Sequence, residues 1–182
     1  MKLIFATSNI NKLKETRKMG FDVDCKNIEL DEIQSIHTEQ VAKHKAAQAY
    51  AKLRLPVIVE DTGLYINELN GFPGALVKWL AHGLGYEKIC RLVDICGNRR
   101  AYAETCIAFC NGKTTKTFVG KVKGRIAMHP KGKRDFGWDY IFIPEGSTKT
   151  FAEMSMKEKN AISMRQIAFV KLRRFLSGKG LV

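Results

Sequence analysis

The stretch Val57-Ile58-Val59-Glu60-Asp61-Thr62-Gly63 decides how this chain folds. Its first three residues form a short, wholly apolar run, which is typical of a strand in a sheet covered on both faces. Two adjacent acids then follow, at which the strand is expected to end, and unpaired acids are costly to bury. Because successive side chains of a strand point in opposite directions, Glu60 and Asp61 are predicted to face opposite sides. One would face a cleft, where a carboxylate can bind Mg²⁺ or orient water, while the other holds a loop or a lysine.

The chain before this stretch predicts two strands and two helices. Asn9 is a good N-cap for the first helix, and Gly20 ends it. Thr38 can cap the second helix, whose apolar residues recur at helical spacing until Pro56 breaks the pattern. The expected elements are a strand at 2–7, a helix at 10–19, a strand at 22–28, a polar loop at 29–37 and a helix at 38–53.

The chain after this stretch predicts a hairpin and several helices. Asn111-Gly112 is the strongest hairpin signal, and Ser155 with Glu158 fits a capping box. The expected elements are a continuation of the strand or a return to the sheet at 64–66, helices at 75–82 and 85–96, strands at 101–110 and 114–122, a basic loop at 123–135, a strand at 140–143, and a helical region from 155 to about 176. No linker separates independent units, so residues 1–182 are expected to form a single α/β domain, with two lobes around a shared sheet and a cleft between them.

Composition bounds the class of protein. The chain has 182 residues and is 45% hydrophobic, enough for a sizeable core. It contains no run of ~18 apolar residues, so no membrane span is expected, and its N-terminus lacks the pattern of a signal peptide. These features favour a soluble intracellular protein. The five cysteines include no Cys-x-x-Cys, which favours reduced core residues over a zinc site or disulfides.

The net charge is +13, and much of it lies in two regions. Residues 112–134 hold eight Lys/Arg and no acid, and residues 157–182 hold seven Lys/Arg and one acid. Such a field attracts nucleotides or nucleic acid. The alternative is a solvated basic surface that only aids solubility. No zinc finger or aromatic RNA-binding signature is present, so nucleic-acid binding is a hypothesis that the sequence does not favour.

Thr7-Ser8-Asn9 follows the first expected strand and opens a helix. Hydroxyls, free backbone N–H groups and the helix dipole suit a phosphate there, and Lys12 lies one turn further on. The alternative is that Asn9 is simply an N-cap. Glu32, in the polar loop, could supply a second oxygen ligand for a metal, or be a solvated surface acid. Lys45 and Lys78 could each reach a polyphosphate, although most lysines face solvent.

The segment Phe136-Gly137-Trp138-Asp139 offers a site for a flat ring. Strand alternation places both aromatic rings on one side, where they could stack on a base while Asp139 accepts hydrogen bonds from a ring N–H. The alternative is an aromatic pair in the core. Lys159 and Arg165 open the last helical region. In a continuous helix they point apart, so their convergence requires a break near residues 160–162.

Together these segments resemble the inosine triphosphate pyrophosphatase family, whose members hydrolyse non-standard purine nucleoside triphosphates. The similar stretches follow the family's order over nearly the whole chain. They are Phe5-Ala6-Thr7-Ser8-Asn9 with Lys12, Val59-Glu60-Asp61-Thr62-Gly63, Asn70-Gly71-Phe72-Pro73-Gly74 with Lys78-Trp79, Phe136-Gly137-Trp138-Asp139, Thr150-Phe151-Ala152-Glu153-Met154 and Glu158-Lys159-Asn160.

The resemblance implies an elongated α/β fold with a central mixed sheet flanked by helices, a cleft between two lobes, and a homodimer. It implies cleavage of ITP, dITP or XTP into the monophosphate and pyrophosphate in the cytoplasm. The cofactor would be Mg²⁺, with Mn²⁺ as an alternative, held by Glu32 and Asp61. Asp61, Lys12 and Lys45 would be catalytic. The implied substrate-binding residues are Thr7, Ser8, Asn9, Lys12, Thr62, Lys78, Phe136, Trp138, Asp139, Lys159 and Arg165.

One position departs from the family pattern. The family reads Ser-His-Arg after the Glu-Lys-Asn segment, whereas this chain has Ser163-Met164-Arg165. Methionine has no N–H donor, while Arg165 keeps several. A pyrophosphatase with shifted or relaxed base specificity is therefore the alternative to the usual preference.

Overall fold

A computed structural model describes residues 3–133 and 137–178 of the chain. Phe136, one of the predicted base-pocket residues, lies outside these ranges. Within them the strands form a mixed seven-stranded sheet in the order β2-β1-β3-β5-β6-β7, with β4 paired to β3. β1 is parallel to β2 and β3, and the other pairs are antiparallel. The strands are β1 (Leu3–Ala6), β2 (Val23–Lys26), β3 (Val57–Ile66), β4 (Pro73–Gly74), β5 (Arg100–Cys110), β6 (Thr115–Ile126) and β7 (Phe142–Pro144).

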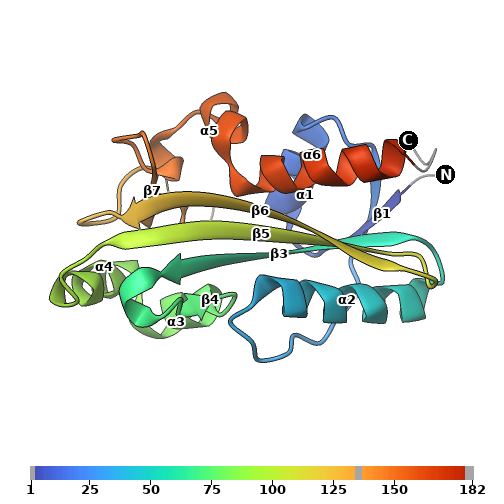
Figure 1. The fold of residues 1–182 in the computed structure, drawn as a ribbon, viewed down its shortest axis with the longest axis horizontal. Coiled ribbons are helices and arrows are strands. Elements are labelled where there is room, and N and C mark those ends of the chain that lie inside the picture. Colours follow the sequence, from blue (N-terminus) through green and yellow to red (C-terminus); the bar gives the residue numbers. More distant parts are fainter. Residues whose placement is uncertain (1–2, 134–136, 179–182) are drawn as a thin grey trace.

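Helices cover the sheet on both sides, which confirms the predicted α/β class. Figure 1 shows α2 along one side and α5 and α6 along the other. α2 buries its alanines against β1, β3 and β5, whereas α6 buries Phe169 and Leu172 against the opposite face. The helices are α1 (Ile10–Lys18), α2 (Thr38–Leu53), α3 (Val77–Leu84), α4 (Tyr86–Ile95), α5 (Met156–Ile162) and α6 (Met164–Ser177), with short 3-10 turns at Asn67–Leu69, Asp139–Ile141 and Phe151–Glu153.

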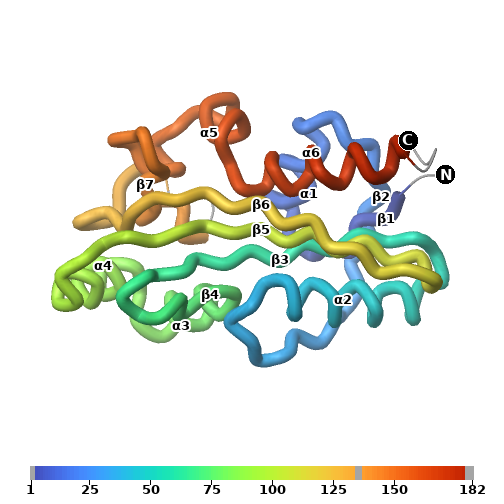
Figure 2. The backbone as a smooth tube through the Cα atoms, viewed as in Figure 1, coloured from blue at the N-terminus to red at the C-terminus, as the bar shows by residue number. Residues whose placement is uncertain are grey.

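β3 is one continuous strand of ten residues, so the expected end at Glu60-Asp61 is wrong. β5 pairs with it along its whole length, from Val57 opposite Cys110 to Ile66 opposite Ala101. Because of these backbone hydrogen bonds the strand continues past the two acids. The local sequence alone suggests that the strand ends at the acids. Figure 2 shows β3, β5 and β6 running side by side along the length of the molecule. The acids therefore lie in mid-strand, where their side chains are held on opposite faces of the sheet.

Several local predictions are confirmed and others shift by a few residues. Asn9 caps α1, and Ser155 with Glu158 forms the capping box of α5. The N-cap of α2 is His37, so Thr38 is its first residue and not its cap. β6 continues to Ile126, into the expected basic loop, because it pairs with β5 and β7 there. The expected strand at 140–143 begins only at Phe142, after a 3-10 turn.

The predicted break in the last helical region is present. Ser163 has extended backbone angles, φ −71° and ψ 149°, and separates α5 from α6 one residue beyond the expected range. Its hydroxyl accepts a hydrogen bond from the backbone N–H of Gln166 at 3.2 Å and so caps α6. Because of this break, the side chains of Lys159 and Arg165 point toward the same carboxylate, Glu15.

Three of the cysteines are buried and reduced: Cys90, Cys106 and Cys110. The prediction that Cys106 and Cys110 are reduced core residues is confirmed. Among the helices of residues 3–133 and 137–178, none combines the length and apolarity that a membrane crossing requires.

Close packing of α6 on β6 depends on Gly120. A Cβ atom at this position would lie 1.8 Å from the carbonyl oxygen of Met164. We expect Gly120→Ala to lower the free energy of unfolding by at least about 2 kcal/mol, because the helix backbone must move away from the strand. Gly83→Ala is the matched control, since a Cβ at Gly83 meets nothing within 4 Å. It should be neutral or stabilising by about 0.5 kcal/mol in urea denaturation, and equal losses in both variants would contradict the packing argument.

Candidate active site

A cavity of about 720 Å³ opens where the ends of β1 and β2, the middle of β3 and the start of α3 meet. Polar side chains dominate its wall. The predicted residues on it are Thr7, Ser8, Asn9, Lys12, Glu32, Lys45, Asp61, Thr62, Lys78 and Trp138. A second cavity of about 430 Å³ is lined by Asp139 and Lys159 among others. Arg165 lines neither of these two cavities.

The N-terminus of α1 faces the large cavity. The Asn9 side-chain oxygen accepts hydrogen bonds from the backbone N–H groups of Asn11 and Lys12, at 3.0 and 3.2 Å. The capping role is thus confirmed, and it places the positive end of the helix dipole, with the exposed Ser8 beside it, at the cavity wall. This is a common arrangement for binding a phosphate.

Lys12 lies over the strand that carries the two acids. Its ammonium is 3.2 Å from the carbonyl oxygen of Glu60 and 3.3 Å from the Glu60 carboxylate. The contacts hold the lysine in the wall between α1 and β3, with its side chain 16% exposed. Lys12 therefore adds a fixed positive charge to the helix N-terminus.

Glu32, Lys45 and Asp61 converge as predicted. The Lys45 ammonium lies 2.6 Å from a Glu32 oxygen and 3.7 Å from Asp61 Oδ1. The other oxygen of Asp61, Oδ2, is buried and has no hydrogen-bond partner among the described residues. Burial raises the pKa of Asp61 to about 6, although Lys12 and Lys45 oppose the shift. In Glu32 burial is outweighed by the hydrogen bond and charge of Lys45, which lower the pKa.

These oxygens fit a divalent metal only together with a ligand. Mg²⁺ is usually held by one or two carboxylates plus substrate phosphates. The two carboxylates on the wall and the unpartnered Oδ2 of Asp61 match that pattern. Within residues 3–133 and 137–178, no group of three or more His, Cys, Asp or Glu could hold a metal without help. A bound polyphosphate would therefore complete the site.

Glu60 points to the other face of β3 and has a different environment. Arg165 donates two hydrogen bonds to its carboxylate, both at 2.9 Å, and the Thr62 hydroxyl donates a third at 2.9 Å. Burial alone would raise the pKa of Glu60, but the charges of Arg165 and Lys12 hold it at about 2. Glu60 is thus a permanent anion that positions Lys12 and Thr62 at the cavity.

Arg165 and Lys159 are joined by a carboxylate that the sequence patterns did not reveal. Glu15 pairs with Arg165 and lies 3.0 Å from the Lys159 ammonium, which is also 2.5 Å from Asp139. Arg165 is completely buried, and its partner Glu15 lines the second cavity. From the sequence, Glu15 looks like an ordinary acidic residue on a helix. It lies three residues after Lys12, so the two side chains share one face of α1, and this spacing is the signal that could have identified Glu15 as a site residue.

The second cavity has a hydrogen-bond acceptor available. Asp139 Oδ1 is buried without a hydrogen-bond partner among the described residues. Burial raises the pKa of Asp139, against the opposing charge of Lys159. Asp139 Oδ1 is thus an available acceptor with Lys159 as a neighbouring donor, while the contact with a ring N–H stays a prediction.

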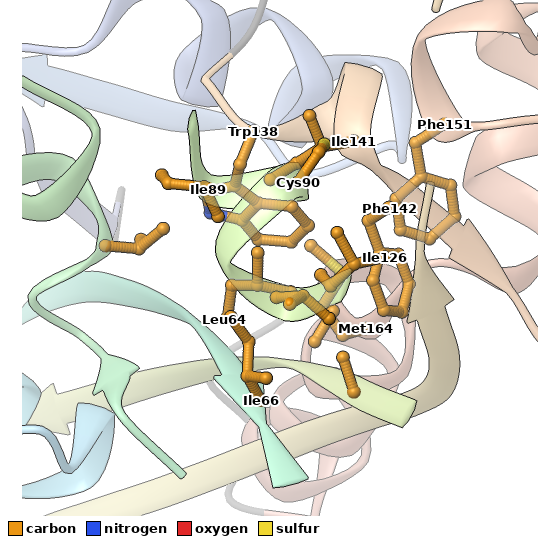
Figure 3. Packing of buried hydrophobic residues seen from close by; sticks show 14 residues of the cluster. Leu64, Ile66, Ile89, Cys90, Ile126, Trp138, Ile141, Phe142, Phe151 and Met164 are labelled. Atoms are coloured by element: carbon orange, nitrogen blue, oxygen red, sulfur yellow. The ribbon is translucent and has the colours of Figure 1, made fainter. Parts of the chain in front are cut away.

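Trp138 and Met164 belong to a hydrophobic cluster under the site. Figure 3 shows Trp138 packed among apolar side chains, and its ring meets that of Phe142 edge to face, with centroids 5.8 Å apart. Trp138 is only 4% exposed, so most of its side chain packs in the core, as the alternative of a core aromatic residue predicts. Met164 is fully buried in the same cluster and lines neither cavity. At this position the side chain faces the core.

The low pKa of Glu60 predicts a specific pH dependence of stability. The folded value of about 2 lies below the ordinary 4.5, so the ionised carboxylate stabilises the fold above pH 4.5, and this contribution is lost as the pH falls toward 2. We expect Glu60→Gln to cost about 3 kcal/mol at pH 7, because Arg165 loses a buried counter-charge. The difference from the unmodified protein should narrow below pH 4.5 in urea denaturation.

The exposed Glu145 provides the control for this experiment. Glu145→Gln should stay within about 0.5 kcal/mol of the unmodified protein at every pH. A constant difference between Glu60→Gln and the unmodified protein from pH 7 to pH 2 would contradict the assignment of Glu60 as the titrating group.

Comparisons with known proteins show the family of the chain. The Ham1 family model matches residues 3–175. The chain is 41% identical to a dITP/XTP pyrophosphatase of Hyperthermus butylicus, covering 98% of this chain and 96% of that protein. It is 37% identical to an inosine triphosphate pyrophosphatase of Kluyveromyces lactis, over 98% and 97% of the two chains. The structure of the Staphylococcus aureus Ham1 protein superposes with a TM-score of 0.85 at 28% identity, covering 98% of this chain and all of that one. The resemblance found in the sequence is therefore confirmed, and the chain belongs to the Ham1 family.

Proposed function

We propose that the protein is a Mg²⁺-dependent pyrophosphatase that hydrolyses ITP, dITP and XTP to the monophosphate and pyrophosphate. The observation that carries the proposal is the buried Asp61 carboxylate, which lies 3.7 Å from the Lys45 ammonium in the cavity wall and has one oxygen without a hydrogen-bond partner among the described residues. The relatives from Hyperthermus butylicus and Kluyveromyces lactis, which bear the names of dITP/XTP and inosine triphosphate pyrophosphatases, support the substrate class.

The polyphosphate would lie along the wall formed by α1, α2 and α3. The N-terminus of α1, with Thr7, Ser8 and Asn9, would bind phosphate oxygens through backbone N–H groups and hydroxyls. Lys12 and Lys45 would neutralise the charge that develops on the leaving pyrophosphate, and the exposed Lys78 would approach from α3. Positive groups from three helices thus surround one anion.

Asp61 would have two tasks. With Glu32 it would hold Mg²⁺, or Mn²⁺ as the alternative, and the metal when bound would polarise the phosphates for attack. Asp61 would also orient the attacking water and take up its proton. A pKa of about 6 lies near neutral pH, which suits a general base. Attack forms a bond between the water oxygen and phosphorus and breaks the bridge between the α- and β-phosphates.

The base would be recognised in the region of the second cavity. Asp139 would accept a hydrogen bond from the ring N–H, and Lys159 would donate to the 6-oxo group of hypoxanthine or xanthine. The 6-amino group of adenine is a donor and would meet a donor there, which disfavours ATP. Arg165 and Glu15 would keep Lys159 in position, and Phe136 is proposed to stack on the base.

The two cavities would form one cleft between two lobes of a single domain spanning residues 1–182. The homodimer and the cytoplasmic location stay predictions from the resemblance.

A panel of triphosphates tests this function. With Mg²⁺, we expect ITP, dITP and XTP to yield pyrophosphate with kcat/KM at least about tenfold above ATP, because the 6-amino donor of adenine facing the Lys159 donor costs more than about 1.4 kcal/mol. Asp61→Asn should lower kcat at least about a hundredfold while the far-UV spectrum stays unchanged, since the variant keeps the shape and loses the base. Orthophosphate as the product, a flat profile or near-normal turnover in Asp61→Asn would refute the proposal.

The burial of Met164 predicts the result of restoring the family's histidine. Met164→His places an imidazole in an apolar cluster, so it should lower the free energy of unfolding by about 2 kcal/mol. The ratio of kcat/KM for ITP and ATP should change less than about threefold, because position 164 does not line either cavity. Met164→Leu, which keeps the apolar packing, is the control for stability. A large gain in selectivity in Met164→His would instead support the hypothesis of a base preference altered by methionine.

A further inference from the structure

The proposed function makes no use of a basic surface on β5 and β6. Arg100, Lys121, Lys123 and Arg125 are exposed, and none of them lines the two cavities. Three of them come from the stretch of residues 112–134 that contains no acid. Together with Tyr102 they are called the basic sheet face below.

The strand register places these five side chains on one side of the sheet. Arg100 is opposite Arg125, and Tyr102 is opposite Lys123. Residues that face each other across an antiparallel pair project to the same side, and so does every second residue of a strand. Lys121, Lys123 and Arg125 therefore form a row along β6, with a spacing of roughly 7 Å between neighbours.

The basic sheet face lies on the side of the sheet that α2 covers only in part. α2 packs on Cys106, Ala108 and Cys110, which belong to the same face nearer the hairpin turn. Figure 1 shows α2 beneath that half of the sheet, away from β7. At the other half of β5, Ala101 and Ala103 are buried against the opposite face, while Arg100 is exposed. The cations thus lie beyond the end of the covering helix.

Little negative charge compensates this surface. Glu104 lies 3.2 Å from the Lys121 ammonium, and its other oxygen accepts a hydrogen bond from Thr38. Within residues 3–133 and 137–178, no salt bridge joins Arg100, Lys123 or Arg125 to a carboxylate. An anionic partner would therefore gain their attraction without breaking a salt bridge, although Arg125 also donates a hydrogen bond to the Ser147 carbonyl oxygen at 3.4 Å.

Tyr102 fixes the position of Lys121 within the basic sheet face. Its ring stacks on that of Tyr65, with centroids 4.6 Å apart and planes 5° apart, and the Lys121 ammonium lies 3.9 Å from its centroid. The stack and the cation–π contact fix the position of Lys121. Because the ring is already engaged, the surface offers positive charge more than a platform for a base. It would contact phosphates, which carry no sequence information.

We propose that the basic sheet face binds single-stranded nucleic acid through its phosphates. A row of cations along one strand matches a single chain of phosphates, and a flexible single strand can follow the twist of the sheet. The site is separate from the nucleotide cavity. Binding should be independent of sequence and should weaken steeply with salt.

Fluorescence anisotropy with labelled oligo(dT) and oligo(rU) of about 20 nucleotides tests this proposal. Both strands carry a 5′-hydroxyl, so neither mimics a nucleoside triphosphate. We expect both to bind, and the slope of log K against log[salt] to be about −3 for four neutralised phosphates. Lys123→Glu/Arg125→Glu should lower the affinity at least about tenfold and make the slope shallower by about 1.4. Lys123→Gln/Arg125→Gln should give a smaller change in the same direction.

A matched double reversal separates local charge from net charge. Lys157→Glu/Arg174→Glu changes the total charge equally, but it lies on α5 and α6, on the side of the sheet opposite α2. It should alter affinity less than about threefold, since screening limits the reach of exposed charges to about 10 Å. Equal losses in both double variants would overturn the proposal. The proposal also fails if the unmodified protein does not bind, or if anionic vesicles or a duplex bind more tightly than the single strands.

Pyrophosphatase assays keep this proposal distinct from the proposed function. Both double variants should hydrolyse ITP with unchanged kcat/KM, and the oligonucleotides should not inhibit the reaction, because the basic sheet face does not line the cavity. Competitive inhibition of ITP hydrolysis by the oligonucleotides would place their binding in the cavity and overturn the separate site. Loss of ITP hydrolysis in every form, with nucleic-acid binding retained, would refute the proposed function alone.

Sedimentation provides one more check: if Lys123→Glu/Arg125→Glu dissociates an oligomer, the surface is an interface between copies of the chain, which would overturn the proposal.

Discussion

The paired hydrogen bonds from Arg165 to Glu60 constrain the rest of the structure. Both side chains are buried, and a buried charge is tolerated only when it is paired and hydrogen-bonded. The pair ties the first turn of α6 to the middle of β3, and Glu15 extends the tie to α1 and, through Lys159, to α5. Four elements, α1, β3, α5 and α6, are therefore joined through one set of buried charges, and residues of the first three line the cavities.

Neighbouring carboxylates on β3 acquire different chemistry from this constraint. Glu60 has a guanidinium and an ammonium as partners, and its pKa lies at about 2. Asp61, one residue further, is buried with one oxygen left without a hydrogen-bond partner among the described residues, and its pKa lies at about 6. The first is a fixed structural anion, and the second can exchange a proton near neutral pH. Strand alternation separates the two environments, so one strand supplies both a support and a reactive group.

Local signals in the sequence identified the parts of the site better than their connections. The cap at Asn9, the opposite directions of Glu60 and Asp61, and the break before α6 all follow from rules that act within a few residues, and all are present. The unbroken course of β3 depends on its pairing with β5, about 45 residues away, which no local pattern encodes. The burial of Arg165 and the role of Glu15 likewise depend on a contact between the two ends of the chain. The orientation of Met164 toward the core follows from how α6 lies on the sheet, which the motif around it does not specify.

The break at Ser163 also bears on how the chain folds. α6 has no acidic residue in its first turn and instead carries Arg165 there, next to the positive end of its own dipole. This charge opposes helix initiation until Glu60 and Glu15 neutralise it. The Ser163 cap sets where α6 starts, but its first turn should become stable only after β3 has paired and α1 has docked. The C-terminal helix would then close the molecule as a late, cooperative step, and a chain that lacked β3 would keep the Ser163 cap but lose the Glu60 carboxylate that neutralises Arg165.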